Sequence, residues 1–146
     1  MTRLECAAES VLFAADIEVE GLRRLTLEGR RPVTVLKVPH HGAKSSLDRQ
    51  WIEDVHPQYA VISVGAANSY GHPVQAVLDA YAEERTTLAR TDRDGAVWVA
   101  GRLSGQGLTV TRMRDRLVQP VDVHAGLWRG EQENWRRLWL QLQDFL

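Results

Sequence analysis

The chain has 146 residues, of which 44% are hydrophobic and 25% charged, and its formal net charge is −1. This composition is typical of a globular domain, and it argues against a disordered chain, a fibrous repeat and a protein that binds polyanions through its overall charge. Its one cysteine, Cys6, excludes an internal disulfide, and no apolar stretch is long enough to span a bilayer. We therefore expect the chain itself to be soluble and to make no membrane contact.

Strands and helices are expected to alternate along the first part of the chain. The expected elements are two short strands at 3–7 and 10–14, a helix at 18–27, a strand at 33–38, a helix at 48–55, a strand at 59–64 and a helix at 73–84. Ser46 is expected to cap the second of these helices, and Pro73 to lie in the first turn of the third. This alternation predicts an α/β fold.

The rest of the chain is expected to be less regular. Residues 89–91 and 96–99 flank Asp-Arg-Asp-Gly at 92–95, a strong hairpin signal. A strand is expected at 107–113. A polar stretch with Pro120 then leads to a final amphipathic helix at about 131–146, rich in tryptophan.

Histidine or aspartate follows three of the expected buried strands, at the point where each strand ends. The residues are Asp16, the pair His40 and His41, and His72. Because the carboxyl ends of strands in α/β proteins gather ligands and catalytic groups, we expect these side chains to converge. Imidazole and carboxylate together suit Zn²⁺ or Mn²⁺.

Each of these residues also has a plain structural interpretation. Asp16 could cap the helix that follows it, and His72 could be an ordinary turn residue before Pro73. In an extended segment His40 and His41 would point opposite ways, so one would face the site and the other would hold the loop. Ser45 and Ser46 could cap a helix, or their hydroxyls could hold a phosphate oxygen.

Four motifs in order resemble one known family. They are Leu-Phe-Ala-Ala-Asp-Ile-Glu at 12–18, Val-Leu-Lys-Val-Pro-His-His-Gly at 35–42, Asn-Ser-Tyr-Gly-His-Pro at 68–73 and Arg-Thr-Asp-Arg-Asp-Gly-Ala at 90–96. Together they closely resemble the C-terminal metallo-β-lactamase-like domain of ComEC-type competence proteins, which import DNA in bacteria. The resemblance covers roughly residues 4–100. It departs mildly where the family usually has glycine, here Ala15, and serine, here Ala43.

The resemblance implies an αββα hydrolase with two metal ions, Zn or Mn, that acts on DNA or another phosphodiester. It implies that Asp16 bridges the ions and His72 binds one of them. His41, or alternatively His40, would lie next to the scissile phosphate as a catalytic group. Ser45 and Ser46 stay the candidate substrate-binding residues, through the phosphate contact described above.

The family's upstream His-x-His/Asp-x-Asp-His segment has no counterpart in this chain. We therefore expect residues 1–116 to form the second half of the αββα sandwich, a mixed sheet flanked by helices, and residues 117–146 a polar connection and the C-terminal helix. Such a half-domain would be inactive without the missing N-terminal half. Its natural parent would be a bacterial inner-membrane protein. The alternative is a non-catalytic module that binds a partner or self-associates as a homo-oligomer.

Overall fold

The structure is a computed structural model that describes residues 1–6, 8–26, 31–101 and 108–118. Its elements in chain order are β1 (Thr2–Cys6), β2 (Glu9–Phe13), α1 (Val19–Thr26), β3 (Val35–Lys37), the 3₁₀ turns η1 (Pro39–Gly42) and η2 (Lys44–Ser46), α2 (Arg49–Val55), β4 (Tyr59–Ile62), α3 (Gln75–Glu83), β5 (Thr87–Arg90), α4 (Thr91–Asp94), β6 (Val97–Gly101), β7 (Leu108–Arg112) and α5 (Met113–Val118). The expected tryptophan-rich helix at 131–146 lies outside the described residues. Within the described ranges, no helix has the length and apolarity needed to cross a membrane.

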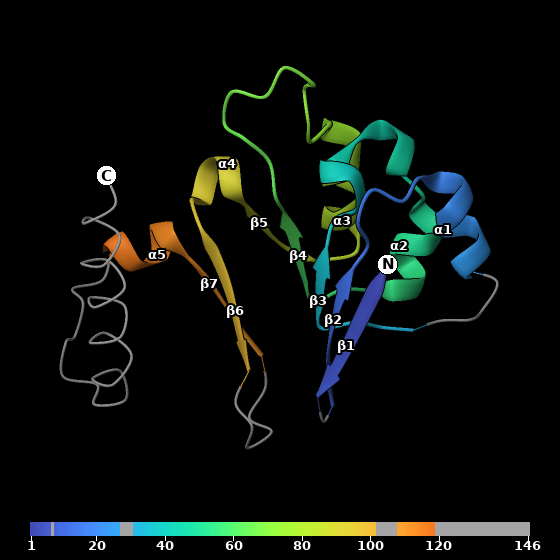
Figure 1. Ribbon diagram of the computed structural model, residues 1–146, viewed down its shortest axis with the longest axis horizontal. Helices are drawn as coiled ribbons and strands as arrows, with labels where there is room; N and C mark the ends of the chain where they lie inside the picture. Colours follow the sequence, from blue (N-terminus) through green and yellow to red (C-terminus); the bar gives the residue numbers. More distant parts are fainter. Residues whose placement is uncertain (7, 27–30, 102–107, 119–146) are drawn as a thin grey trace, which may run out of the picture.

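Five strands form one mixed sheet in the order β1-β2-β3-β4-β5. β1 runs antiparallel to β2, and the pairs β2–β3, β3–β4 and β4–β5 are parallel. The arrows of the parallel strands point to the same end of the molecule in Figure 1, so their carboxyl ends share one edge. The expected α/β fold is confirmed.

One face of this sheet forms the core together with α1, α2 and α3. Leu12 pairs with Leu36, and Leu36 with Ala60, and all three side chains are buried. Their apolar partners from the helices include Leu22, Trp51, Ile52, Val77 and Tyr81. Figure 1 shows the three helices grouped together, with the β6–β7 hairpin set apart from them.

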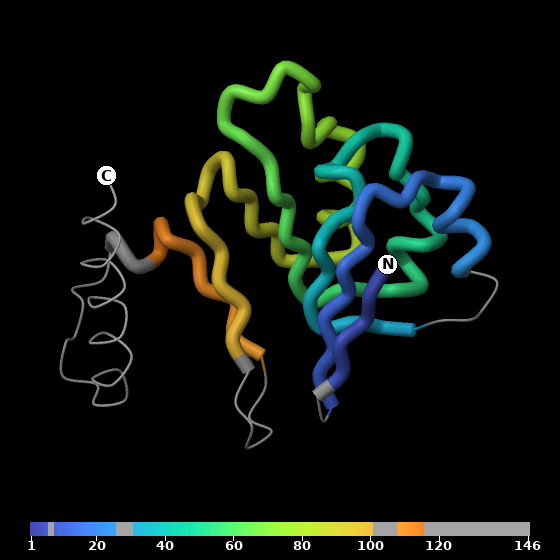
Figure 2. Tube along the Cα trace, in the orientation of Figure 1, coloured from blue at the N-terminus to red at the C-terminus, as the bar shows by residue number. Residues whose placement is uncertain are grey.

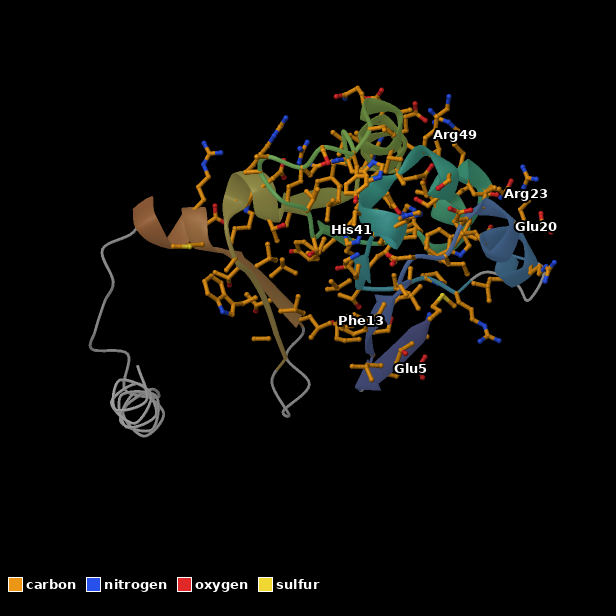
Figure 3. The ribbon with its side chains drawn as sticks, turned by 45° about the horizontal axis from the view of Figure 1, so that its top comes forward. Glu5, Phe13, Glu20, Arg23, His41 and Arg49 are labelled. Atoms are coloured by element: carbon orange, nitrogen blue, oxygen red, sulfur yellow. The ribbon has the colours of Figure 1, made fainter. Side chains whose placement is uncertain are left out.

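The opposite face of the sheet is also apolar but remains open at its β1–β2 edge. Phe13 lies across from Thr2, and Leu4 lies across from Val11, so these four side chains share that face. Leu4 is 55% exposed and Phe13 is 44% exposed. Figure 3 shows Phe13 at the end of β2.

The prediction that residues 89–91 and 96–99 pair in a hairpin is wrong. β5 pairs in parallel with β4, whereas β6 pairs with β7 in a separate two-stranded sheet. Between β5 and β6, residues 91–94 form a helical turn, in which the Asp94 carboxylate accepts a hydrogen bond from the Arg90 N–H at 2.8 Å. Aspartate and glycine signal a change of chain direction, but they do not determine whether the next strand pairs with the previous one.

Two expected helix starts are also corrected. The N-cap of α2 is Asp48, whose carboxylate accepts from the Trp51 N–H at 3.0 Å, and not Ser46. α3 begins at Gln75, so Pro73 precedes the helix and does not lie within its first turn. In both cases the preceding loop has its own fixed geometry, which delays the start of the helix by one or two residues.

Candidate functional site

Backbone hydrogen bonds join the loops that follow the parallel strands. The His40 N–H donates to the Ala15 carbonyl at 2.9 Å, and the Val74 N–H donates to the Gly42 carbonyl at 3.0 Å. These bonds tie the loop after β3 to the loops after β2 and β4. Figure 2 shows the long loop between β4 and α3, in green, rising beyond the ends of the strands.

The turn at residues 40–42 has a left-handed backbone. The φ angles are 44° at His40, 55° at His41 and 81° at Gly42. The extended geometry assumed from the sequence is therefore wrong for the two histidines. Left-handed backbone costs a non-glycine residue about 1–2 kcal/mol, and such strain concentrates at functional sites.

His41 lies between a carbonyl and a carboxylate. Its Nδ1 is 2.6 Å from the Ser63 carbonyl oxygen, and its Nε2 is 3.6 Å from Asp16 Oδ1. Because a carbonyl only accepts, Nδ1 carries the hydrogen, and Nε2 is the atom that faces Asp16. His41 is labelled in Figure 3 on the segment after β3.

His40 lies on the other side of the same turn. Its Nδ1 is 3.3 Å from the Ser45 hydroxyl and 3.5 Å from Glu18 Oε1, and the same hydroxyl donates to Glu18 at 3.1 Å. The His40 ring meets the His72 ring edge-on, with 6.1 Å between centroids. Both histidines of the pair therefore reach the candidate site, from opposite sides.

His72 is held by its loop and has one unsatisfied atom. Asn68 accepts from the His72 N–H at 3.0 Å and donates to the His72 carbonyl at 2.9 Å. The Tyr70 ring stacks on the imidazole with 6.0 Å between centroids. Among the described residues His72 Nδ1 has no hydrogen-bond partner although it is buried. A buried imidazole nitrogen without a partner is a fitting ligand for Zn²⁺ or Mn²⁺.

A pocket joins the loops after β3, β4 and β5. It has a volume of about 350 Å³, and its lining includes His41, Asn68, Tyr70, His72 and Thr91. Larger hollows of about 510 and 480 Å³ lie near His56, at the amino ends of the parallel strands. We assign the site to the smaller pocket because it holds two of the residues that the sequence singles out.

The two serines differ in their surroundings. Ser45 is exposed and contacts His40 and Glu18, within the candidate site. Ser46 is buried, and its hydroxyl hydrogen-bonds to the carbonyls of Pro39 and Ala43 at 3.2 and 2.9 Å. In this conformation Ser46 holds the loop together.

Asp16 does not occupy the position of a helix cap. α1 begins at Val19, so the residue directly before the helix is Glu18. The Asp16 side chain is 68% exposed at the edge of the sheet, toward His41. The cap interpretation is wrong, and the metal interpretation of Asp16 stays a prediction.

The sequence interpretation passed over three residues around the site. Lys37 ends β3, and burial lowers its pKa, an effect that the charge of Asp16 partly offsets. Thr91 accepts from the Val64 N–H at 2.7 Å and donates to the Val64 carbonyl at 2.8 Å, which fixes the loop after β4. Glu18 contacts His40 and Ser45. Lys37 could have been found in the sequence, because it is a single charged residue within an apolar strand.

The number of metal ligands in the site is small. No three His, Cys, Asp or Glu side chains of the described ranges are grouped so that they could hold one metal ion. Structural and catalytic zinc sites use three or four protein ligands. Asp16 and His72 carry donor atoms of the kind that Zn²⁺ and Mn²⁺ bind, but a tight site needs further ligands.

Curated relatives match part of the chain. ComE operon protein 3 of Bacillus subtilis (strain 168) is 34% identical over 95 residues, which are 64% of this chain and 12% of that protein. Competence protein ComA of Neisseria gonorrhoeae is 32% identical over 114 residues, 77% of this chain and 16% of that protein. Recombination protein 2 of Haemophilus influenzae is 29% identical over 90 residues, 62% and 11% of the two chains. No family model and no solved structure matches the chain. The relatives confirm the family resemblance drawn from the motifs.

Proposed function

We propose, on the premise that this chain is homologous over part of its length to ComEC-type competence proteins, that it contributes one half of a metal-dependent phosphodiesterase site that acts on DNA during uptake. The chain spans 11–16% of the length of these relatives, so the activity of a whole protein of their kind is part of this proposal. We infer that the sheet and its helices are the second half of a metallo-β-lactamase-like αββα sandwich.

One observation carries this proposal. The loops after β2 and β3 bring Asp16 within 3.6 Å of His41, and His41 and His72 line the same pocket. An acid and two imidazoles from three separate loops thus lie at the carboxyl edge of the sheet, Asp16 beside His41, and His41 in one pocket with His72. The left-handed backbone at two consecutive histidines supports a functional role for this turn, because strained backbone is concentrated at functional sites.

The protein groups have distinct roles in the proposed site. His41, with the hydrogen on Nδ1 held by Ser63, presents Nε2 to the substrate and can donate a proton to the leaving oxygen. Asp16 Oδ1 lies 3.6 Å from that Nε2, on the neighbouring loop. His40 is fixed by Glu18 and Ser45, which leaves its second nitrogen available to a phosphoryl oxygen.

Asp16 and His72 are the residues that would hold the metal ions, Zn or Mn, together with ligands from the other half of the domain. When bound, the ions would supply a nucleophilic water at neutral pH and would offset the charge on the phosphoryl oxygens. Among the described residues, the buried His72 Nδ1 has no hydrogen-bond partner, which supports the assignment of His72 as a metal ligand. We further propose that the complete parent is a bacterial inner-membrane protein.

A comparison of this chain with a longer one that includes the preceding segment of the natural protein tests the proposal. We expect the longer chain to bind Mn²⁺ or Zn²⁺ and to cut DNA, and this chain to bind metal weakly and to leave DNA intact. In the longer chain, Asp16→Ala and His72→Ala should abolish metal binding, measured by calorimetry. His41→Ala should preserve metal binding and reduce cleavage by about 10²–10⁴-fold.

Two controls make the result decisive. His56→Ala removes an exposed histidine at the far end of the strands and should change neither readout. A folded longer chain that binds no metal and cleaves no DNA would refute the phosphodiesterase proposal.

A second function is favoured by the open apolar face of the sheet. Leu4 and Phe13 expose large apolar side chains on the strand pair at the edge of the sheet, as expected of an association surface. In this alternative the chain is a non-catalytic module that self-associates or binds a partner. Sedimentation of this chain as a dimer that Phe13→Glu dissociates, together with an inert longer chain, would support the alternative.

A further inference from the structure

Among the large apolar and aromatic residues that the structure describes, Tyr70 has the largest exposed fraction. It is 81% exposed, in the loop between β4 and α3. The His72 imidazole lies nearly parallel to the Tyr70 ring, with 19° between the planes and 6.0 Å between the centroids.

The loop that carries Tyr70 is braced on both sides of the ring. Asn68 Nδ2 donates to the carbonyls of Gly65 and His72 at 3.0 and 2.9 Å, and Asn68 Oδ1 accepts from the His72 N–H. Because these bonds hold the backbone around the tyrosine, less backbone entropy is lost when a ligand binds to the ring. An exposed, pre-positioned aromatic ring is a typical stacking platform.

The ring also borders the pocket that contains His41. Tyr70, His41 and Thr91 line the same space of about 350 Å³. A group stacked on Tyr70 would thus belong to the same nucleotide, or the next one, as a phosphate held at His41. This juxtaposition connects the ring to the substrate site and distinguishes it from an incidental surface aromatic.

We propose that Tyr70 stacks on an unpaired nucleobase of single-stranded DNA and so positions the neighbouring phosphodiester at His41. The inference deepens the proposed function and rests on it for the identity of the substrate. An unpaired base is the fitting partner because its face is free, whereas bases in a duplex already stack on their neighbours. The contact reads no base edge, so it favours single strands without favouring one sequence.

Binding of a short fluorescent single-stranded oligonucleotide to this chain, in the presence of EDTA, tests the inference. We expect Tyr70→Ala to weaken binding by roughly 5- to 150-fold, as measured for one lost base–aromatic stack. Tyr70→Phe keeps the ring and should bind as the wild type does. Tyr59→Ala makes the same change at the opposite end of β4 and should leave the affinity unchanged.

The probe with no bases gives the sharpest comparison. An abasic oligonucleotide of equal length carries the same charge, so Tyr70→Ala should leave its affinity unaltered. Equal loss of affinity for both probes, a wild-type chain that does not prefer the probe with bases, or an unaltered affinity of a folded Tyr70→Ala chain would overturn the inference. Metal binding and cleavage by the longer chain are separate readouts, so the phosphodiesterase proposal can fail while this inference survives, and the reverse.

Discussion

Gly42 lies against Pro73, and the two residues join the loop after β3 to the loop after β4. A Cβ atom built on Gly42 would be 2.6 Å from Pro73 Cβ, and the φ angle of Gly42 is +81°. Glycine is thus required here for two independent reasons, space and backbone geometry. The pairing brings the turn with His40 and His41 against the segment that carries His72.

Gly42→Ala should therefore destabilise the fold and separate the two loops. We expect a loss of about 2–4 kcal/mol in the free energy of unfolding, because overpacking and left-handed strain add to each other. Urea denaturation measures the loss. The matched control is Gly65→Ala, since a Cβ at Gly65 meets no atom within 4 Å; equal stability of the two variants would contradict the prediction.

The strain in the histidine turn predicts an unusual order of stability. His40→Gly and His40→Ala both remove the imidazole, but only glycine relieves the left-handed backbone at φ 44°. We expect His40→Gly to be more stable than His40→Ala by about 1 kcal/mol, which is the steric relief less the entropy of glycine. Thermal denaturation of the two variants would show the difference, and a less stable glycine variant would mean that the turn is not left-handed.

Ala15 offers a similar test outside the histidine turn. Its φ angle is 54°, at a position where the resembled family usually has glycine. Ala15→Gly should raise the free energy of unfolding by up to about 1 kcal/mol. Ala14→Gly is the control, because Ala14 is fully buried and has no positive φ angle; that change should destabilise. A drop in stability for both variants would count against the described geometry.

Thr91 stabilises the loop after β4 through its hydroxyl. Thr91→Val keeps the shape of the side chain but leaves the Val64 N–H without its acceptor, so we expect a loss of about 1–3 kcal/mol. Thr91→Ser keeps the hydroxyl and should lose less. Hydrogen exchange of the Val64 amide provides a local readout, and unchanged protection in Thr91→Val would refute the role of this hydrogen bond.

Tyr81 makes stability depend on pH in the alkaline range. Burial raises the pKa of Tyr81 far above the value of 10.0 for an exposed phenol. Above about pH 10 the unfolded chain loses this proton and the folded chain keeps it, so the free energy of unfolding falls as the pH rises.

The fall attributable to Tyr81 should approach about 1.4 kcal/mol per pH unit above pH 10. Tyr81→Phe has no such proton, so its stability should fall less steeply over the same range. Urea denaturation at pH 9, 10 and 11 measures both slopes. Parallel slopes for the two proteins would show that Tyr81 ionises equally in the folded and unfolded states.

The pattern of apolar residues was sufficient to predict the layered α/β fold. Leu12, Leu36 and Ala60 belong to short apolar runs, and the helical periodicities between those runs produced helices close to their expected positions. Local patterns succeed here because each parallel strand must be buried by the helix that connects it to the next. The positions of Asp16, His41 and His72 in the loops after β2, β3 and β4 followed from the same alternation.

Only the tertiary structure decided how those residues face one another. The left-handed turn at His40 and His41, the contact of His41 with Ser63 and the parallel pairing of β5 with β4 all depend on atoms distant in sequence. Sequence motifs predict where the chain turns. Packing and hydrogen bonds between loops determine the direction that the chain takes after the turn. The sequence therefore identified the candidate side chains. The fold determined which nitrogen of each imidazole faces a carboxylate, a carbonyl or a pocket.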